Sequence, residues 1–62
     1  MLSERENQVI KLLSKGLSNK DIAVALSLSP FTVKRHIENI YHKLKIHNRV
    51  ELLENARKSK MI

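Results

Sequence analysis

The clearest pattern in the chain is a stripe of apolar residues that follows Pro30. The stripe is spaced i, i+4, i+7 and i+11 and consists of Val33, Ile37, Ile40 and Leu44. This spacing places its members along one narrow side of an α-helix. Ser29 suits the N-cap of that helix, and Pro30 suits its first position. The pattern therefore predicts a helix over residues 30–44 that is anchored along one edge.

The opposite side of this helix is polar. At about 100° per residue, the outward side chains are Phe31, Lys34, Arg35, Glu38 and His42, flanked by Asn39 and Lys43. Long polar side chains on the free face of an anchored helix suit the reading of base edges in a major groove. A charged face by itself is more often only solvated, so the preceding sequence has to decide between the two interpretations.

Two shorter helices are predicted before this one. The first covers about residues 4–15, because Ser3 and Glu6 form a capping box and Gly16 provides a left-handed stop. The second covers about residues 19–26, with Ser18 as its N-cap. The Asp21 side chain is expected to accept a hydrogen bond from the Ser18 backbone N–H in return.

Only three residues separate the second and third predicted helices. Ala23 is small enough to let another helix cross closely, and the short link then predicts a helix-turn-helix. The glycine usual in that turn is absent. Ser27 or Leu28 stands in its place, so the turn must be accommodated in another way.

A fourth helix is predicted over about residues 49–58, with Asn48 and Glu51 as a further capping box. One side of it is apolar, and Val50, Glu54 and Arg57 share the opposite side. The tail after residue 58 is expected to fray. The chain is therefore expected to be one all-α domain over residues 1–62, a four-helix bundle with a helix-turn-helix.

The net charge of +6 in 62 residues is unevenly placed. Residues 34–49 contain the bases Lys34, Arg35, Lys43, Lys45 and Arg49 against one acid, Glu38. Such an excess suggests a surface that faces a polyanion, although charge alone does not separate nucleic acid from an anionic membrane. There is no cysteine, membrane span or signal peptide, so a cytoplasmic protein is expected.

Chemistry other than binding finds little support in the sequence. His36, His42 and His47 lack metal-ligand spacing, and four short helices are expected to offer no cleft for catalysis. We therefore expect no metal, no cofactor and no enzymatic activity. His36 is expected to be a packed, hydrogen-bonded structural residue, and Tyr41 part of the core.

Several motifs run in register along nearly the whole chain. They are Leu2-Ser3-x-Arg5-Glu6, Gly16-Leu17-Ser18-Asn19-Lys20-x-Ile22-Ala23, Ser29-x-x-Thr32-Val33-Lys34-x-His36, Asn39-Ile40-x-x-Lys43-Leu44 and Asn48-Arg49-Val50-Glu51. These motifs resemble the LuxR-type (GerE-like) helix-turn-helix domain. The resemblance implies a DNA-binding domain at the C-terminus of a bacterial transcription regulator, with its third helix in the major groove and its fourth mediating a homodimer on DNA.

Residue roles follow from the same resemblance. It places Lys34, Arg35 and Glu38 against bases. The positions near phosphates are Asn19, Lys20, Thr32, Asn39 and Lys43. The dimer contact on the fourth helix would involve Val50, Glu54 and Arg57. One departure is Lys45, where the family usually has glycine; this residue must accept a left-handed conformation or re-route the turn.

Family members usually have an N-terminal receiver or sensor domain, and RNA polymerase is a further expected partner. The chain is then either an excised effector domain or a minimal standalone regulator; its start close to the domain edge favours excision. Two alternatives stay open: a helical protein-interaction module and a sigma-factor-like promoter-recognition region. The capped fourth helix favours the LuxR-type domain over the latter.

Overall fold

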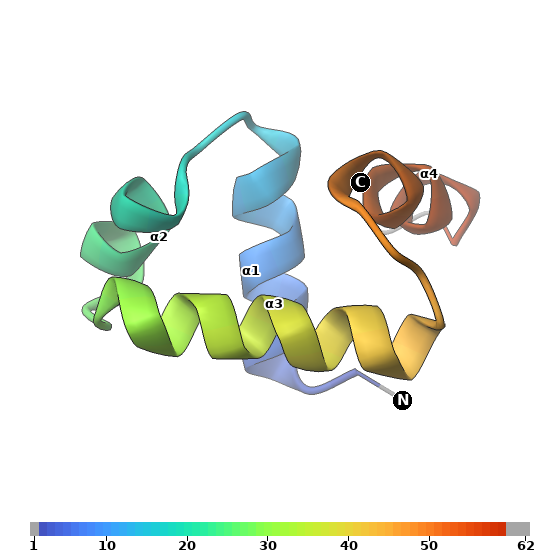
Figure 1. Ribbon diagram of the computed structural model, residues 1–62. Coiled ribbons are helices and arrows are strands. Elements are labelled where there is room, and N and C mark those ends of the chain that lie inside the picture. The colour runs from blue at the N-terminus through green and yellow to red at the C-terminus, as the bar shows by residue number, and fades with distance from the viewer. Residues whose placement is uncertain (1, 60–62) are drawn as a thin grey trace.

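The computed structural model describes residues 2–59, which form four α-helices (Figure 1). They are α1 (Glu4–Ser14), α2 (Asn19–Leu26), α3 (Pro30–Leu44) and α4 (Arg49–Lys58). The predicted all-α fold with a helix-turn-helix is confirmed, and α1 ends one residue earlier than expected. Of the tail expected to fray, residues 60–62 lie outside the described residues. No helix within residues 2–59 has the length and apolar composition that crossing a membrane requires.

The four helices begin at the predicted caps. At Ser3, Ser18, Ser29 and Asn48, a side-chain oxygen accepts a hydrogen bond from the backbone N–H three residues later, at 2.9–3.2 Å. These bonds satisfy amides that would otherwise lack a partner in the first turn. Four independent starts explain why so short a chain forms helices at these places.

The return bonds of the three predicted capping boxes differ. In α1 the box is complete, because the Ser3 N–H donates to Glu6 Oε1 at 2.8 Å. In α4 the Glu51 carboxylate instead accepts the N–H of His47, at 3.2 Å. In α2 the expected return from Asp21 is wrong: among residues 2–59 the Asp21 side chain makes no such bond.

Residues with positive φ lie within two positions of the ends of the first three helices. Gly16 has φ 86°, and the non-glycine residues Ser27 and Lys45 have φ 57° and 55°. Ser27 is thus how the α2–α3 turn manages without glycine, and Lys45 accepts the left-handed conformation rather than re-routing the chain. Each non-glycine residue costs about 1–2 kcal/mol in this region.

The core lies where α1 meets the other three helices. Its buried residues are Val9, Ile10, Leu13, Ile22, Ala23, Val33, Ile40, Leu52 and Ala56. α3 packs against α1 and α2, whereas α4 packs mainly against α1. In Figure 1, α3 crosses in front of α1, with α2 near its N-terminal end and α4 above its C-terminal end. α1 is therefore the scaffold, and α3 presents a long free face.

Candidate nucleic-acid interface

The outward face of α3 is exposed as predicted. Its exposed side chains are Phe31, Lys34, Arg35, Glu38, Asn39, His42 and Lys43. The opposite side is held by Val33 and Ile40, which are fully buried, while Ile37 and Leu44 pack half-buried at the edge of the core. A helix fixed in this way cannot roll about its axis without exposing apolar surface. The three residues predicted to contact bases therefore lie together on one fixed surface.

An ion pair that we did not anticipate ties α3 to α1. Lys43 Nζ lies 2.7 Å from Glu6 Oε1. The Glu6 side chain is only 4% exposed, and that of Lys43 is 43% exposed. The pair joins the first turn of α1 to the last turn of α3. A residue expected to contact phosphate thus also positions the helix that holds it.

The environment of Glu6 lowers the pKa of its carboxyl group. Burial is the largest influence and raises the pKa, because it disfavours the charged form. The hydrogen bond from Lys43, two hydrogen bonds involving Ser3 and the charge of Lys43 act in the other direction. Together they outweigh burial, so the pKa lies below its ordinary value of 4.5. Glu6 is consequently an anion at neutral pH although it is almost completely buried.

The other residues predicted to lie near phosphates flank the outward face. Asn19 and Lys20 are exposed in the first turn of α2, and Asn39 is exposed on α3. Thr32 is half-buried, and its Oγ1 lies 2.9 Å from Ser29 Oγ, so the two hydroxyls share a hydrogen bond at the start of α3. Thr32 and Asn39 thus lie on α3 itself, whereas Asn19 and Lys20 lie at the start of α2.

The residues predicted for a dimer contact are available on α4. Val50 is 65% exposed, and Glu54 and Arg57 are also exposed. The neighbouring Arg49 has a structural role, because its Nη2 donates to the Leu13 carbonyl oxygen at 2.7 Å. That contact fixes the start of α4 to the end of α1, at a carbonyl oxygen that also accepts the Gly16 N–H at 2.9 Å.

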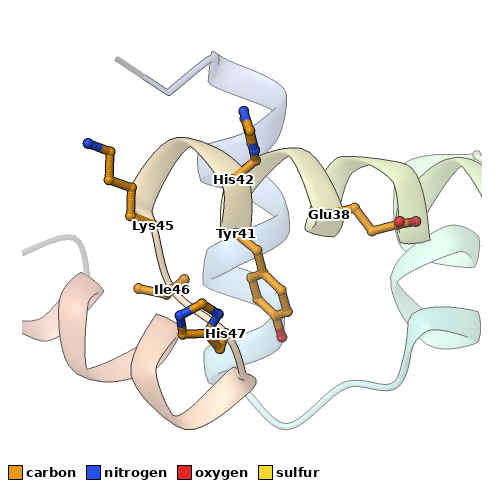
Figure 2. Close-up of a pocket in the computed structure, with 6 residues that line it drawn as sticks. All are labelled: Glu38, Tyr41, His42, Lys45, Ile46 and His47. Atoms are coloured by element: carbon orange, nitrogen blue, oxygen red, sulfur yellow. The ribbon is translucent and has the colours of Figure 1, made fainter.

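An open hollow of about 580 Å³ lies at the junction of α3 and α4 (Figure 2). It is lined by Glu38, Tyr41, His42, Lys45, Ile46 and His47. This hollow was not anticipated from the sequence. Its polar groups lie on the rim, while Tyr41 and Ile46 are half-buried and pack against the core.

The histidines do not form a metal site in the described part of the chain. Residues 2–59 contain no group of three His, Cys, Asp or Glu side chains placed to hold a metal ion. His36 is half-buried as expected, and its hydrogen bonding stays a prediction.

The chain is similar to known bacterial regulators. Residues 1–56 match the family described as bacterial regulatory proteins, luxR family. The chain is 47% identical over its whole length to the Fimbriae Z protein of Escherichia coli. Over 89% of its length it is 47% identical to a putative HTH-type transcriptional regulator of Mycobacterium bovis.

A solved structure agrees with these relatives. The crystal structure of the response regulator ChrA, from a heme-sensing two-component system, superposes on the whole chain with a TM-score of 0.93 and 40% identity. The chain spans only 31% of that structure, 30% of Fimbriae Z and 6% of the Mycobacterium bovis regulator. A match to the family model over residues 1–56 nevertheless covers most of the sequence. The chain therefore belongs to the luxR family of bacterial regulatory proteins.

Proposed function

We propose that this chain binds double-stranded DNA sequence-specifically, with α3 in the major groove, and that it thereby regulates transcription. The observation that supports this most directly is the outward face of α3, where Lys34, Arg35 and Glu38 are exposed on a helix fixed by a buried stripe. An α-helix fits the major groove, which is about 12 Å wide and displays a distinct donor and acceptor pattern for each base pair.

Three side chains are proposed to read bases. Lys34 and Arg35 are donors suited to guanine O6 and N7, and Glu38 can accept a hydrogen bond from a cytosine amino group. Glu38 is the informative case, because a carboxylate is repelled by phosphates and proximity to DNA alone does not explain it. A surface ion pair with a neighbour four residues away would be worth only about 0.3–0.5 kcal/mol.

Phosphate contacts are proposed on both flanks of α3. Lys20 is the simplest of them, because it is exposed and lies in the first turn of α2, where helix polarity also favours an anion. Asn19, Thr32 and Asn39 would add neutral contacts. Lys43 can still offer N–H donors to a phosphate, since its ammonium has three and Glu6 takes one.

Two copies are proposed to bind together on DNA through Val50, Glu54 and Arg57 of α4. This patch is small and mixed in polarity, well below the area of a stable free dimer, so the chain is expected to be monomeric until DNA brings two copies together. In a longer protein, the similarity to a response regulator supports a receiver domain as the attached partner, and RNA polymerase is proposed as a further target. No catalytic role is proposed.

Selection of bound sequences from a random duplex pool tests this proposal. Recovery of two related half-sites about 10 base pairs apart is expected, since one helical turn separates the grooves that a dimer reads. The affinity should also fall steeply with salt. A helical protein-interaction module with the same fold would enrich no sequence and bind random DNA only weakly, and that result would refute the proposal.

A further inference from the structure

We propose that the hollow between α3 and α4 is a binding site for the DNA sugar–phosphate backbone, with Lys45 as its phosphate contact and His47 as a second donor. This inference rests on the proposed function and extends it to three residues, His42, Lys45 and His47, that have no role in base reading. It also assigns a function to the hollow, which the packing of four helices does not by itself require.

The first argument is position along α3. Lys45 lies eleven residues after Lys34, which is about 16 Å along a helix at 1.5 Å per residue. A recognition helix lies in the major groove and contacts base edges mainly through its N-terminal residues. If Lys34 contacts a base edge, the end of α3, about 16 Å further along, is therefore expected to lie near the backbone rather than the bases. Glu38 and His42 belong to both the outward face and the hollow, so the two surfaces are continuous.

The second argument is chemical. A nucleic-acid backbone alternates apolar sugars with anionic phosphates. The hollow has half-buried Tyr41 and Ile46 on its inner side and exposed His42, Lys45 and His47 on its rim. A sugar can pack against the first pair while the phosphates on either side of it accept hydrogen bonds from different parts of the rim, because Figure 2 shows Lys45 and His42 pointing away from His47. Each imidazole has at least one N–H donor, and the Lys45 ammonium has three.

Glu38 is the one acid that lines the hollow, and a carboxylate close to the phosphate would oppose binding. Figure 2 shows its carboxylate pointing toward the N-terminal half of α3, away from Lys45 and His47. The other charged group of the hollow, Lys45, is exposed at the opposite end. The acid therefore lies beside the base-reading residues and leaves the cationic end free for the phosphate.

The conformation of Lys45 is consistent with a functional reason for the side chain. Its φ of 55° would be adopted at lower cost by glycine. The chain instead keeps a lysine here and carries the cost. This makes Lys45→Gly an unusually clean test, since the substitution removes the ammonium and relaxes the backbone at once.

The experiment measures duplex affinity against salt for the unmodified chain, Lys45→Gly, His47→Ala and a control, Lys11→Gln. The control removes an exposed charge from α1, a helix for which no DNA contact is proposed. Lys45→Gly should lower the slope of log affinity against log salt by about 0.9 and weaken all sequences alike. The factor by which Lys45→Gly binds more weakly than the unmodified chain should therefore be roughly 3.5-fold smaller at 200 mM salt than at 50 mM. Lys11→Gln should leave both quantities unchanged.

His47→Ala should weaken binding to all duplexes by a few-fold, through loss of the imidazole. The start of α4 should be unaffected, because the hydrogen bond from the residue 47 backbone N–H to Glu51 remains. An unchanged slope in a folded Lys45→Gly variant, or an effect equal to that of Lys11→Gln, would overturn the inference while leaving the proposed function intact. Absence of salt-dependent binding by the unmodified chain would instead refute the function itself. Inorganic phosphate at constant ionic strength should not move the His42 and His47 imidazole resonances; a shift at millimolar phosphate would assign the hollow to a free anion.

Discussion

Replacing Lys43 with methionine should destabilise the domain more than any other loss of a surface lysine. Methionine keeps most of the aliphatic stem but removes the ammonium that lies 2.7 Å from Glu6 Oε1. The carboxylate, with its side chain 4% exposed, then keeps only the bonds involving Ser3. A buried charge that loses its partner is one of the few causes of a large mutational effect.

The magnitude follows from the exposure of the two partners. A hydrogen bond to a charged group is worth about 1.5–3 kcal/mol, but Lys43 is 43% exposed, and solvent screens part of that value. We expect a loss of about 1–3 kcal/mol in the free energy of unfolding. The whole domain should have roughly 3–9 kcal/mol at 0.05–0.15 kcal/mol per residue. For a chain of this size, a loss of about 2 kcal/mol lowers Tm by about 8–16 °C.

The assay is urea unfolding of Lys43→Met, Glu6→Gln and the double variant, followed by circular dichroism. Lys34→Met serves as the control, because it removes an exposed ammonium from the same helix and should change stability by less than about 0.5 kcal/mol. The coupling energy between Glu6 and Lys43 should be about 1–2 kcal/mol. A coupling below about 0.5 kcal/mol would show that the pair behaves like an exposed one, and the positioning role of Lys43 would be wrong.

The same variants should differ in their response to acid. The folded-state pKa of Glu6 lies below 4.5, so its contribution to stability is complete above that pH and is lost as the pH falls through the folded value. Without Lys43, burial is opposed only by the bonds involving Ser3. The dependence of stability on pH between about 5 and 3 should therefore be flatter in Lys43→Met, as unfolding at several pH values can measure.

The remaining predictions concern DNA. Lys20→Ala should lower the salt slope by about 0.9 and weaken all duplexes alike, which a competition between selected and random duplexes would measure. Lys34→Ala should relax preference at one base position at a cost of about 1–3 kcal/mol; an unchanged selected logo would exclude base reading. Glu38→Ala should raise affinity for random DNA and flatten the preference at one base pair. If every base preference survives, Glu38 forms only a surface ion pair and does not read a base. Val50→Arg should weaken binding to a two-site operator more than binding to a half-site. Equal weakening of both would show that α4 does not form the interface.

The helices could be predicted because their determinants are local. Ser3, Ser18, Ser29 and Asn48 act within three residues of themselves, and the stripe of α3 repeats within one helix. The exposed outward face followed from the same geometry. That much of the candidate site was therefore visible in the sequence.

Contacts between distant residues were not visible in the same way. Glu6 and Lys43 are separated by 37 positions, and each already had a local explanation, a capping box and a polar helix face. Arg49 likewise reaches back 36 positions to the Leu13 carbonyl. The hollow depends on the left-handed conformation of Lys45, and the sequence left open whether this residue would adopt it. A buried position at the first turn of α1 was the available clue, since Glu6 lies one turn before the core residues Val9 and Ile10.

The dependence of α4 on a single neighbour has a consequence for how the domain opens. α4 packs mainly on α1, through Leu52 and Ala56 and the bond from Arg49 to Leu13. The other three helices share contacts among themselves that do not involve it. Transient detachment of α4 should therefore be the lowest-energy partial unfolding event, with backbone amides of α4 exchanging with solvent faster than those of α3. Contact between two copies through α4 would slow that exchange, so binding of a second copy would stabilise the least stable helix of the first.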